Sequence, residues 1–216
     1  MKKLLIISFF ATIFYACEKR NEPLPEDKGC IEKLVIPVSS HGALSDSEYN
    51  LVHSLFISNG IAESNFRYTR TYHDSVQTYN GIYDFRNVHI IQYANELPVF
   101  TGSLNYLFKN GIFNSFSGYL TNGTNLDNIP ALTLPQLRKL FIDDIELFDH
   151  KGPQYKDSCI NAEFGYFNLN AGTSNNSENL VKAWHLTPKY KSYPEGYYQD
   201  RHGQRIYYFN GIETFK

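Results

Sequence analysis

The residue types that most often do chemistry are spread along this chain and form no known catalytic pattern. No two of the seven histidines lie two or four residues apart in the sequence. A metal site would therefore have to assemble from distant positions. Ser103 follows Gly102 but lacks the Gly-x-Ser-x-Gly elbow of a nucleophilic serine, and Cys159 has no neighbouring histidine to act as its base. We therefore expect no enzymatic activity, no metal and no cofactor.

Two adjacent carboxylates, Asp143 and Asp144, are of the type that serves as acid and base in glycoside hydrolysis. They fall in a predicted helix, where successive side chains point about 100° apart. The same helix places both of them off an apolar stripe that includes Leu137, Phe141 and Ile145. The expected position for both carboxylates is a solvated helix face, with no shared site.

The N-terminus has the parts of a secretory signal that ends in a cysteine. Two lysines precede an apolar run over residues 4–15, which is too short to cross a hydrocarbon core of about 30 Å as a helix. The segment Phe14–Cys17 resembles a lipobox, in which Cys17 is lipidated and begins the mature chain. We expect residues 1–16 to be a signal peptide and residues 17–29 to be the lipidated cysteine and a flexible tether.

The expected location is the cell envelope, with a lipid anchor in the outer membrane as the only membrane contact. An ordinary secreted protein and an uncleaved anchor are the alternatives. The charges that follow Cys17 are of both signs, so the periplasmic face and the outer surface both stay open. The formal net charge is −2 and neither sign forms a long run, which gives no reason to expect nucleic-acid binding.

If Cys17 carries lipid, Cys30 and Cys159 remain as a pair in an oxidising compartment. We expect a disulfide between them, which would join the start of the folded region to a distant loop. Two separate buried thiols are the alternative. Metal ligation is disfavoured because neither cysteine lies in a Cys-x-x-Cys motif or near a histidine.

Aromatic residues are unusually frequent, with 17 tyrosines and 16 phenylalanines. Both types favour strands, and a tyrosine can bury its ring while its hydroxyl stays in water. Tyrosines gather near the C-terminus, where flat rings could stack on sugars or hold a peptide. Because side chains alternate across a strand, only half of them can share a face, and core packing is the alternative. The candidate binding residues are Tyr193, Tyr197, Tyr198, Tyr207 and Tyr208.

The pattern of elements predicts an α+β fold, with antiparallel sheets and helices packed on one face. Ser45 with Glu48, and Thr133 with Gln136, are capping-box pairs that begin two helices. Asn110-Gly111 between apolar runs is the preferred turn of a hairpin. The expected strands are Ile31–Val38, Phe66–Tyr72, Val88–Tyr93, Val99–Phe108, Ile112–Tyr119, Phe164–Leu169, Leu180–Leu186, Gly196–Gln199 and Arg205–Phe209.

Two stretches resemble known propeptide domains. Residues 88–104, with a strand ending at Gln92 and a Pro-Val-Phe turn, resemble the FTP motif of fungalysin- and thermolysin-like metallopeptidase propeptides. Residues 180–207, with Ala183-Trp184 and an Asp-x-x-Gly turn, resemble the end of a PepSY domain. The resemblance implies an FTP-like unit over 30–127 and a PepSY-like unit over 128–216, possible similar halves that each hold a helix and a meander.

The chain has no His-Glu-x-x-His, so the zinc site of those peptidases is absent. The resemblance implies a protein-binding module that acts in trans, as an inhibitor or folding aid of an envelope or secreted protein such as a metallopeptidase. An exposed sheet edge or a helix face would be its natural contact surface. A glycan-binding accessory lipoprotein that uses the C-terminal tyrosines is the alternative function. A small hydrolase with a distributed site is the third.

Overall fold

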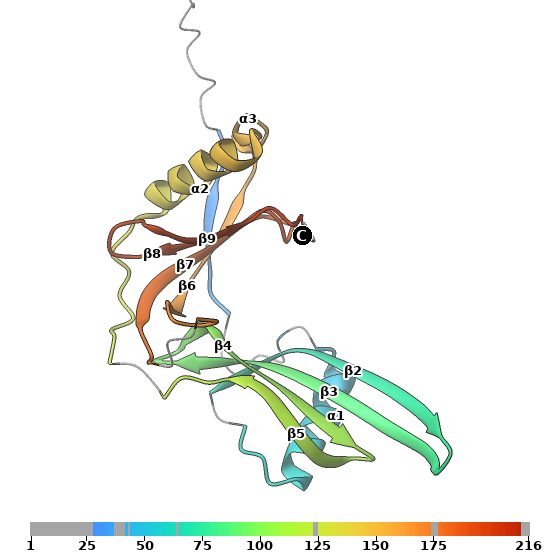
Figure 1. Cartoon of the computed structure of the whole chain (residues 1–216). Coiled ribbons are helices and arrows are strands. Elements are labelled where there is room, and N and C mark those ends of the chain that lie inside the picture. The colour runs from blue at the N-terminus through green and yellow to red at the C-terminus, as the bar shows by residue number, and fades with distance from the viewer. Residues whose placement is uncertain are drawn as a thin grey trace, which may run out of the picture.

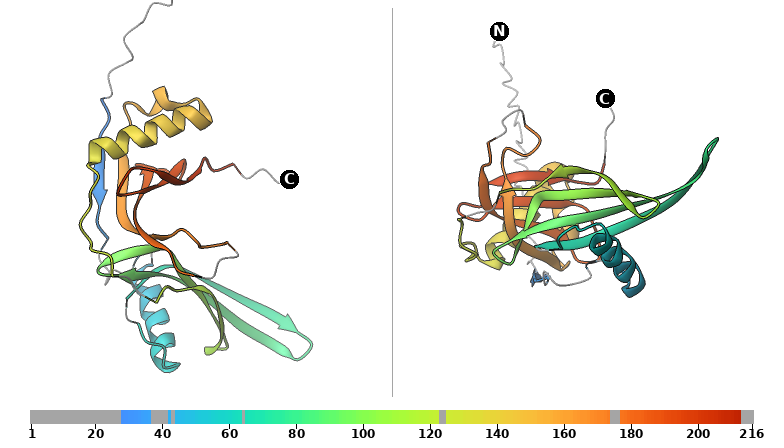
Figure 2. Two further views of the ribbon diagram at one scale, coloured as in Figure 1. Left: turned by 60° about the vertical axis from the view of Figure 1, so that its left-hand side comes forward. Right: turned by 90° about the horizontal axis from the view of Figure 1, so that it is seen from below.

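The fold is one curled sheet with its helices on the outer side of the curl (Figures 1 and 2). A computed structural model describes residues 28–36, 42, 44–63, 65–122, 125–173 and 177–212. The predicted signal peptide, Cys17 and nearly all of the tether lie outside these residues. No helix in the described part of the chain is long and apolar enough to cross a membrane. The α+β class is confirmed, with sheet as the larger part.

The first half of the sheet is packed against one helix. Its capping box is present, because Ser45 N–H donates to the Glu48 carboxylate at 2.9 Å. Val52 and Phe56 are buried against Ile90, Tyr106 and other residues of the sheet. The elements are α1 (Asp46–Ser58), β2 (Phe66–Thr78), β3 (Gly81–Ala94), β4 (Leu97–Lys109) and β5 (Ile112–Tyr119).

The other part of the sheet is packed against a second long helix. Gln136 accepts a hydrogen bond from Thr133 N–H at 2.9 Å, as the predicted capping box requires. Leu137, Phe141 and Ile145 are fully buried against the sheet, where Trp184 is central and 1% exposed. The elements are α2 (Leu134–Asp149), α3 (Gly152–Tyr155), β6 (Ile160–Asn168), β7 (Leu180–Pro188), β8 (Glu195–Gln199) and β9 (Arg205–Phe209).

The two halves meet where β4 changes partners. Its later residues lie between β3 and β5, whereas near its start Val99 pairs with Tyr166 of β6 in parallel. β1 (Ile31–Leu34) also runs parallel to β6 and pairs with its first four residues. It lies on the same side of β6 as β4. The strand order is β2-β3-β4-β6-β7-β8-β9. The sheet bends at this junction, so the face without α1 and α2 becomes the concave side (Figure 2).

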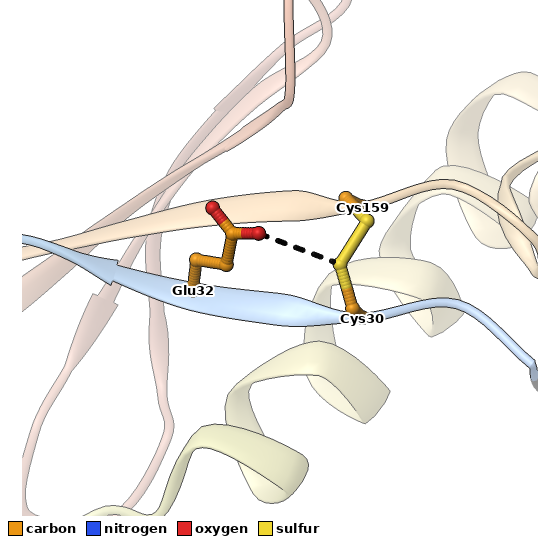
Figure 3. Close-up of side chains that lie close together, drawn as sticks. All are labelled: Cys30, Glu32 and Cys159. Atoms are coloured by element: carbon orange, nitrogen blue, oxygen red, sulfur yellow. Dashed lines mark hydrogen bonds between the residues drawn. A yellow bond between two sulfur atoms is a disulfide. The ribbon is translucent and has the colours of Figure 1, made fainter.

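A disulfide joins Cys30 to Cys159, as the sequence predicted. It lies at the start of both β1 and β6 and fixes the register of this parallel pair (Figure 3). The Glu32 carboxylate lies 3.9 Å from Cys30 Sγ, and Lys189 Nζ donates to Glu32 at 2.9 Å. The covalent bond therefore adds to polar contacts that already hold β1 in place.

Reducing this disulfide is expected to lower the free energy of unfolding by about 2–5 kcal/mol, because it closes a long loop in the unfolded chain. The sequence separation of the two cysteines is 129 residues. Urea unfolding of the oxidised and the reduced protein measures the difference. Cys30→Ser with Cys159→Ser serves as the control without thiols, and equal unfolding midpoints for all three proteins would contradict the prediction.

Four predicted strands differ in extent from the structure. The hairpin of β2 and β3 is longer than the predicted strands and projects from the body as an arm (Figure 1). Residues 72–82 are all exposed, so the arm has no apolar alternation by which the sequence could reveal its length. β6 begins at Ile160 rather than at Phe164, and β1 ends at Leu34, while residues 37–38 lie outside the described part.

The expectation that Asp143 and Asp144 share a solvated face is wrong for Asp144. Asp143 is exposed and pairs with Lys139 at 2.5 Å. The side chain of Asp144 is only 14% exposed, because it turns toward the sheet and accepts hydrogen bonds from Tyr198 and Arg205. Arg205 comes from the last strand, so the sequence near the helix held no sign of this contact.

Candidate binding surface

The five candidate tyrosines divide between the two faces of the sheet. Tyr198 OH donates to Asp144 at 2.8 Å and Tyr208 OH donates to Asp149 at 2.6 Å, so both point toward α2. Burial, with these carboxylates beside them, raises the pKa of both hydroxyls. Tyr198 and Tyr208 therefore join the sheet to its helix and do not belong to an open surface. The other three tyrosines lie on the concave face.

The concave face carries a continuous row of rings, which we call the aromatic ladder. Neighbouring rings lie 4.4–6.3 Å apart between centroids. The closest pair is His185 on Tyr197, stacked with an interplanar angle of 10°. Such contacts fix the orientation of each ring. The members, from β4 to the edge of the sheet, are Phe100, Phe167, His185, Tyr197, Tyr207, Phe209 and Tyr193.

The ladder becomes more exposed toward the edge of the sheet. Tyr197 is partly buried in the middle, whereas Tyr207 is 46% exposed and Tyr193 is 47% exposed. Both helices that pack on the sheet lie on its other side (Figure 2). Within the described residues, the outer end of the ladder is therefore a broad aromatic surface open to solvent.

Two acidic residues lie beside the ladder, and each has a partner. His185 Nε2 lies 3.0 Å from Glu195 Oε2, and Arg67 donates to Glu163 at 3.4 Å. Glu163 pairs with His185 across the two neighbouring strands β6 and β7. Burial, together with Glu195 and Glu163, raises the pKa of Tyr197, so its hydroxyl stays protonated at neutral pH. Around Tyr197 the surface thus combines aromatic rings with hydrogen-bonding carboxylates.

The ladder ends at a free strand edge. β9 pairs with β8 and with no other strand in the described part of the chain. Tyr207 and Phe209 line the concave side of this edge, and on the other side Phe148, 46% exposed, stacks on Tyr208 at 5.1 Å. An extended segment laid along β9 would therefore meet aromatic rings on both of its faces.

The described residues contain little that supports catalysis or metal binding. The group of His, Cys, Asp or Glu side chains found there close enough to hold a metal is Cys30, Glu32 and Cys159, whose two sulfurs are bonded to each other. His53 contacts Glu63 at 2.5 Å, and Tyr68 donates to the same carboxylate. This cluster joins α1 to β2 and is part of the packing between them.

Sequence reasoning found the outer end of the ladder but missed its inner members. Phe100, Phe167 and His185 lie on strands that are far apart in sequence and neighbours only in the folded sheet. The alternation of tyrosines in β8 and β9 was the usable signal, since it predicted that half of them would share a face. No comparable signal connects Phe100 with Tyr197.

No protein-family model matches this chain, and a search of curated proteins also finds no match.

Proposed function

We propose that this chain is a lipid-anchored, non-catalytic protein of the cell envelope that binds another envelope or secreted protein. Its partner would be held as an extended segment on the outer end of the aromatic ladder and along the free edge of β9. In the manner of a separate propeptide, it would inhibit or assist a secreted enzyme such as a metallopeptidase in trans. The Cys30–Cys159 disulfide fits an oxidising compartment.

The observation that carries this proposal is the exposed aromatic surface beside an unpaired strand. Interfaces between proteins are enriched in tyrosine and other aromatic residues, which supply much of the binding energy. Tyr207 lies in β9 and Tyr193 in the segment just before β8, and both are about half exposed. Strand addition supplies main-chain hydrogen bonds, while side chains on both faces select the partner.

The order of elements supports the propeptide-like part of the proposal. A helix followed by four strands, paired antiparallel, occurs twice: α1 with β2–β5, and α2 with β6–β9. This is the arrangement expected of an FTP-like unit followed by a PepSY-like unit. The Asp-x-x-Gly turn joins β8 to β9, where the resemblance places it.

Replacing both Tyr193 and Tyr207 with alanine is expected to weaken partner binding at least 10-fold, because interface aromatics often contribute 2 kcal/mol or more, about 30-fold in affinity. The full chain would capture partners from the envelope and secreted fraction of its own organism, and mass spectrometry would identify them. Surface plasmon resonance would then compare the variant with the unaltered protein. A metallopeptidase whose activity falls on binding would establish the trans-acting role.

The matched control is Tyr79→Ala. Tyr79 is fully exposed in the turn between β2 and β3 and is not a member of the ladder. Its loss should leave the affinity unchanged. If the ladder variant binds the captured partner as tightly as this control, the aromatic surface is not the binding site.

Glycan binding is a second candidate, because the exposed rings of Tyr193 and Tyr207, with the partly buried Phe209 beside them, would also suit stacking on sugars. Retention on polysaccharide resin, with no protein captured from the same fraction, would favour it. The same two-tyrosine variant should then lose retention while Tyr79→Ala keeps it. Capture of a specific protein with no affinity for polysaccharide would exclude this alternative.

A further inference from the structure

One acidic side chain lies within the outer part of the aromatic ladder. Glu195 and Tyr197 are two residues apart in β8, so their side chains share the concave face. Glu195 pairs with Phe209 across to β9, and Tyr197 pairs there with Tyr207. From the other neighbouring strand, His185 Nε2 contacts Glu195 Oε2 at 3.0 Å. Aromatic rings therefore border this carboxylate on all three strands.

The Glu195 carboxylate keeps the capacity to bind a further group. Its side chain is 22% exposed, and a carboxylate can accept about four hydrogen bonds, of which His185 takes up one. No lysine or arginine in the described part of the chain forms an ion pair with Glu195. Glu163, the other acidic residue beside the ladder, does have such a partner, because Arg67 lies 3.4 Å from it. The uncompensated carboxylate of the ladder is thus the outer one.

From this arrangement we propose that Glu195 selects partner segments that carry a lysine or an arginine. The inference rests on the proposed binding of an extended segment along β9. The basic group would contact the Glu195 carboxylate and the ring faces of Phe209 and Tyr207. Aromatic ring faces attract cations, and a carboxylate attracts the same group by its charge. Charge complementarity of this kind decides which partners bind.

The spacing of the strands favours a long side chain in the partner. Neighbouring strands lie about 4.8 Å apart, so a segment paired with β9 would lie about 10 Å from β8. A side chain that reaches Glu195 from that segment has to cross Phe209, its neighbour on β9. Lysine and arginine can lay an apolar stem on the ring and extend their charged group beyond it. An acidic segment would place like charges together and be rejected.

A library of random seven-residue peptides displayed on phage, selected on the full chain, tests the inference. Peptides bound by the unaltered chain are expected to be enriched in lysine or arginine at one position. Replacing that basic residue with glutamine should weaken binding to the unaltered chain about 10-fold, since an ion pair and a ring contact are lost together. Glu195→Gln should abolish the enrichment, although it keeps a side chain of nearly the same shape.

The matched control is Asp143→Asn, which removes the same charge from an exposed position on α2. This variant should select the same basic peptides as the unaltered chain. Glu195→Lys should select acidic peptides instead, a reversal that a misfolded protein could not show. Basic peptides that are still enriched by Glu195→Gln or by Glu195→Lys would overturn the inference, because the cation would then bind elsewhere.

The combined variant Tyr193→Ala, Tyr207→Ala separates this inference from the proposed function. If the selected peptides need these tyrosines but are no richer in basic residues than the unselected library, the role of Glu195 is refuted and the aromatic surface remains a binding site. If the chain retains no peptide above background, or if the two-tyrosine variant binds the selected peptides equally well, both the proposed binding along β9 and the inference fail.

Discussion

Replacing Asp200 with alanine is expected to lower the free energy of unfolding by about 3–5 kcal/mol, as is typical when one partner of a buried charged network is removed. Asp200 is fully buried in the Asp-x-x-Gly turn. Its carboxylate accepts hydrogen bonds from Trp184 Nε1 at 2.8 Å and from the backbone N–H groups of Ala131 and Leu132. Without the carboxylate, these buried donors lose their partner.

The contacts of Asp200 explain why a substitution in this one turn is expected to lower the stability so strongly. They join the turn after β8 to the central tryptophan of β7 and to the segment that leads into α2. Lys182 Nζ, 3.8 Å from the carboxylate, adds a positive charge at the same point. The start of the helix and the end of the meander are therefore held by a single side chain.

Urea unfolding followed by tryptophan fluorescence measures this loss, since Trp184 is the only tryptophan and contacts Asp200 directly. Asp143→Ala is the control, because Asp143 is an exposed partner of Lys139 and such pairs contribute about 1 kcal/mol or less. If both substitutions lower the free energy of unfolding equally, the hydrogen bonds of Asp200 contribute no more to stability than an exposed ion pair.

Replacing Arg138 with methionine is expected to cost a similar amount, about 3–5 kcal/mol. Arg138 lies in α2 and is 5% exposed. Its guanidinium donates to the backbone carbonyls of Cys30, Ser158, Tyr155 and Lys156 at 2.7–3.2 Å. Methionine keeps the apolar stem but removes all four of these hydrogen bonds, and the carbonyls of Cys30, Tyr155 and Lys156 each keep one backbone N–H donor. The loss in stability therefore measures the hydrogen bonds of the guanidinium more than its packing.

The neighbouring Lys139 supplies the control for Arg138, since its side chain is 76% exposed in the same helix. Lys139→Met should change the unfolding midpoint little. Because Arg138 holds the chain on both sides of the disulfide, its loss should also cost more in the reduced protein than in the oxidised one. Equal costs in the two redox states would show that guanidinium and disulfide act independently.

The sequence by itself determined the local features whose causes lie within a few residues. Ser45 with Glu48 and Thr133 with Gln136 begin helices because each pair satisfies backbone groups at the helix start. Asn110-Gly111 makes the β4–β5 turn because both residues take positive φ, 52° and 77°. The pairing of Cys30 with Cys159 followed from counting cysteines, once Cys17 was set aside for lipid.

The placement of the tyrosines was half determined in the same way. Alternation along β8 and β9 required that some of them face the core and others the opposite side. Alternation alone does not say which side is covered. The position of α2 decides this, because its Asp144 and Asp149 accept hydrogen bonds from the hydroxyls of Tyr198 and Tyr208. Tyr197 and Tyr207, which alternate with them, therefore lie on the concave face.

Only the tertiary structure decided how the strands that follow α1 join the strands that follow α2 and what their junction exposes. The change of partner along β4 and the inclusion of Phe100 and Phe167 in the ladder depend on pairings between strands far apart in sequence. Such pairings have no local signature, because the residues that meet are selected by the packing of the whole sheet. The local chemistry of the chain therefore defined its elements, and the long-range pairing defined its surfaces.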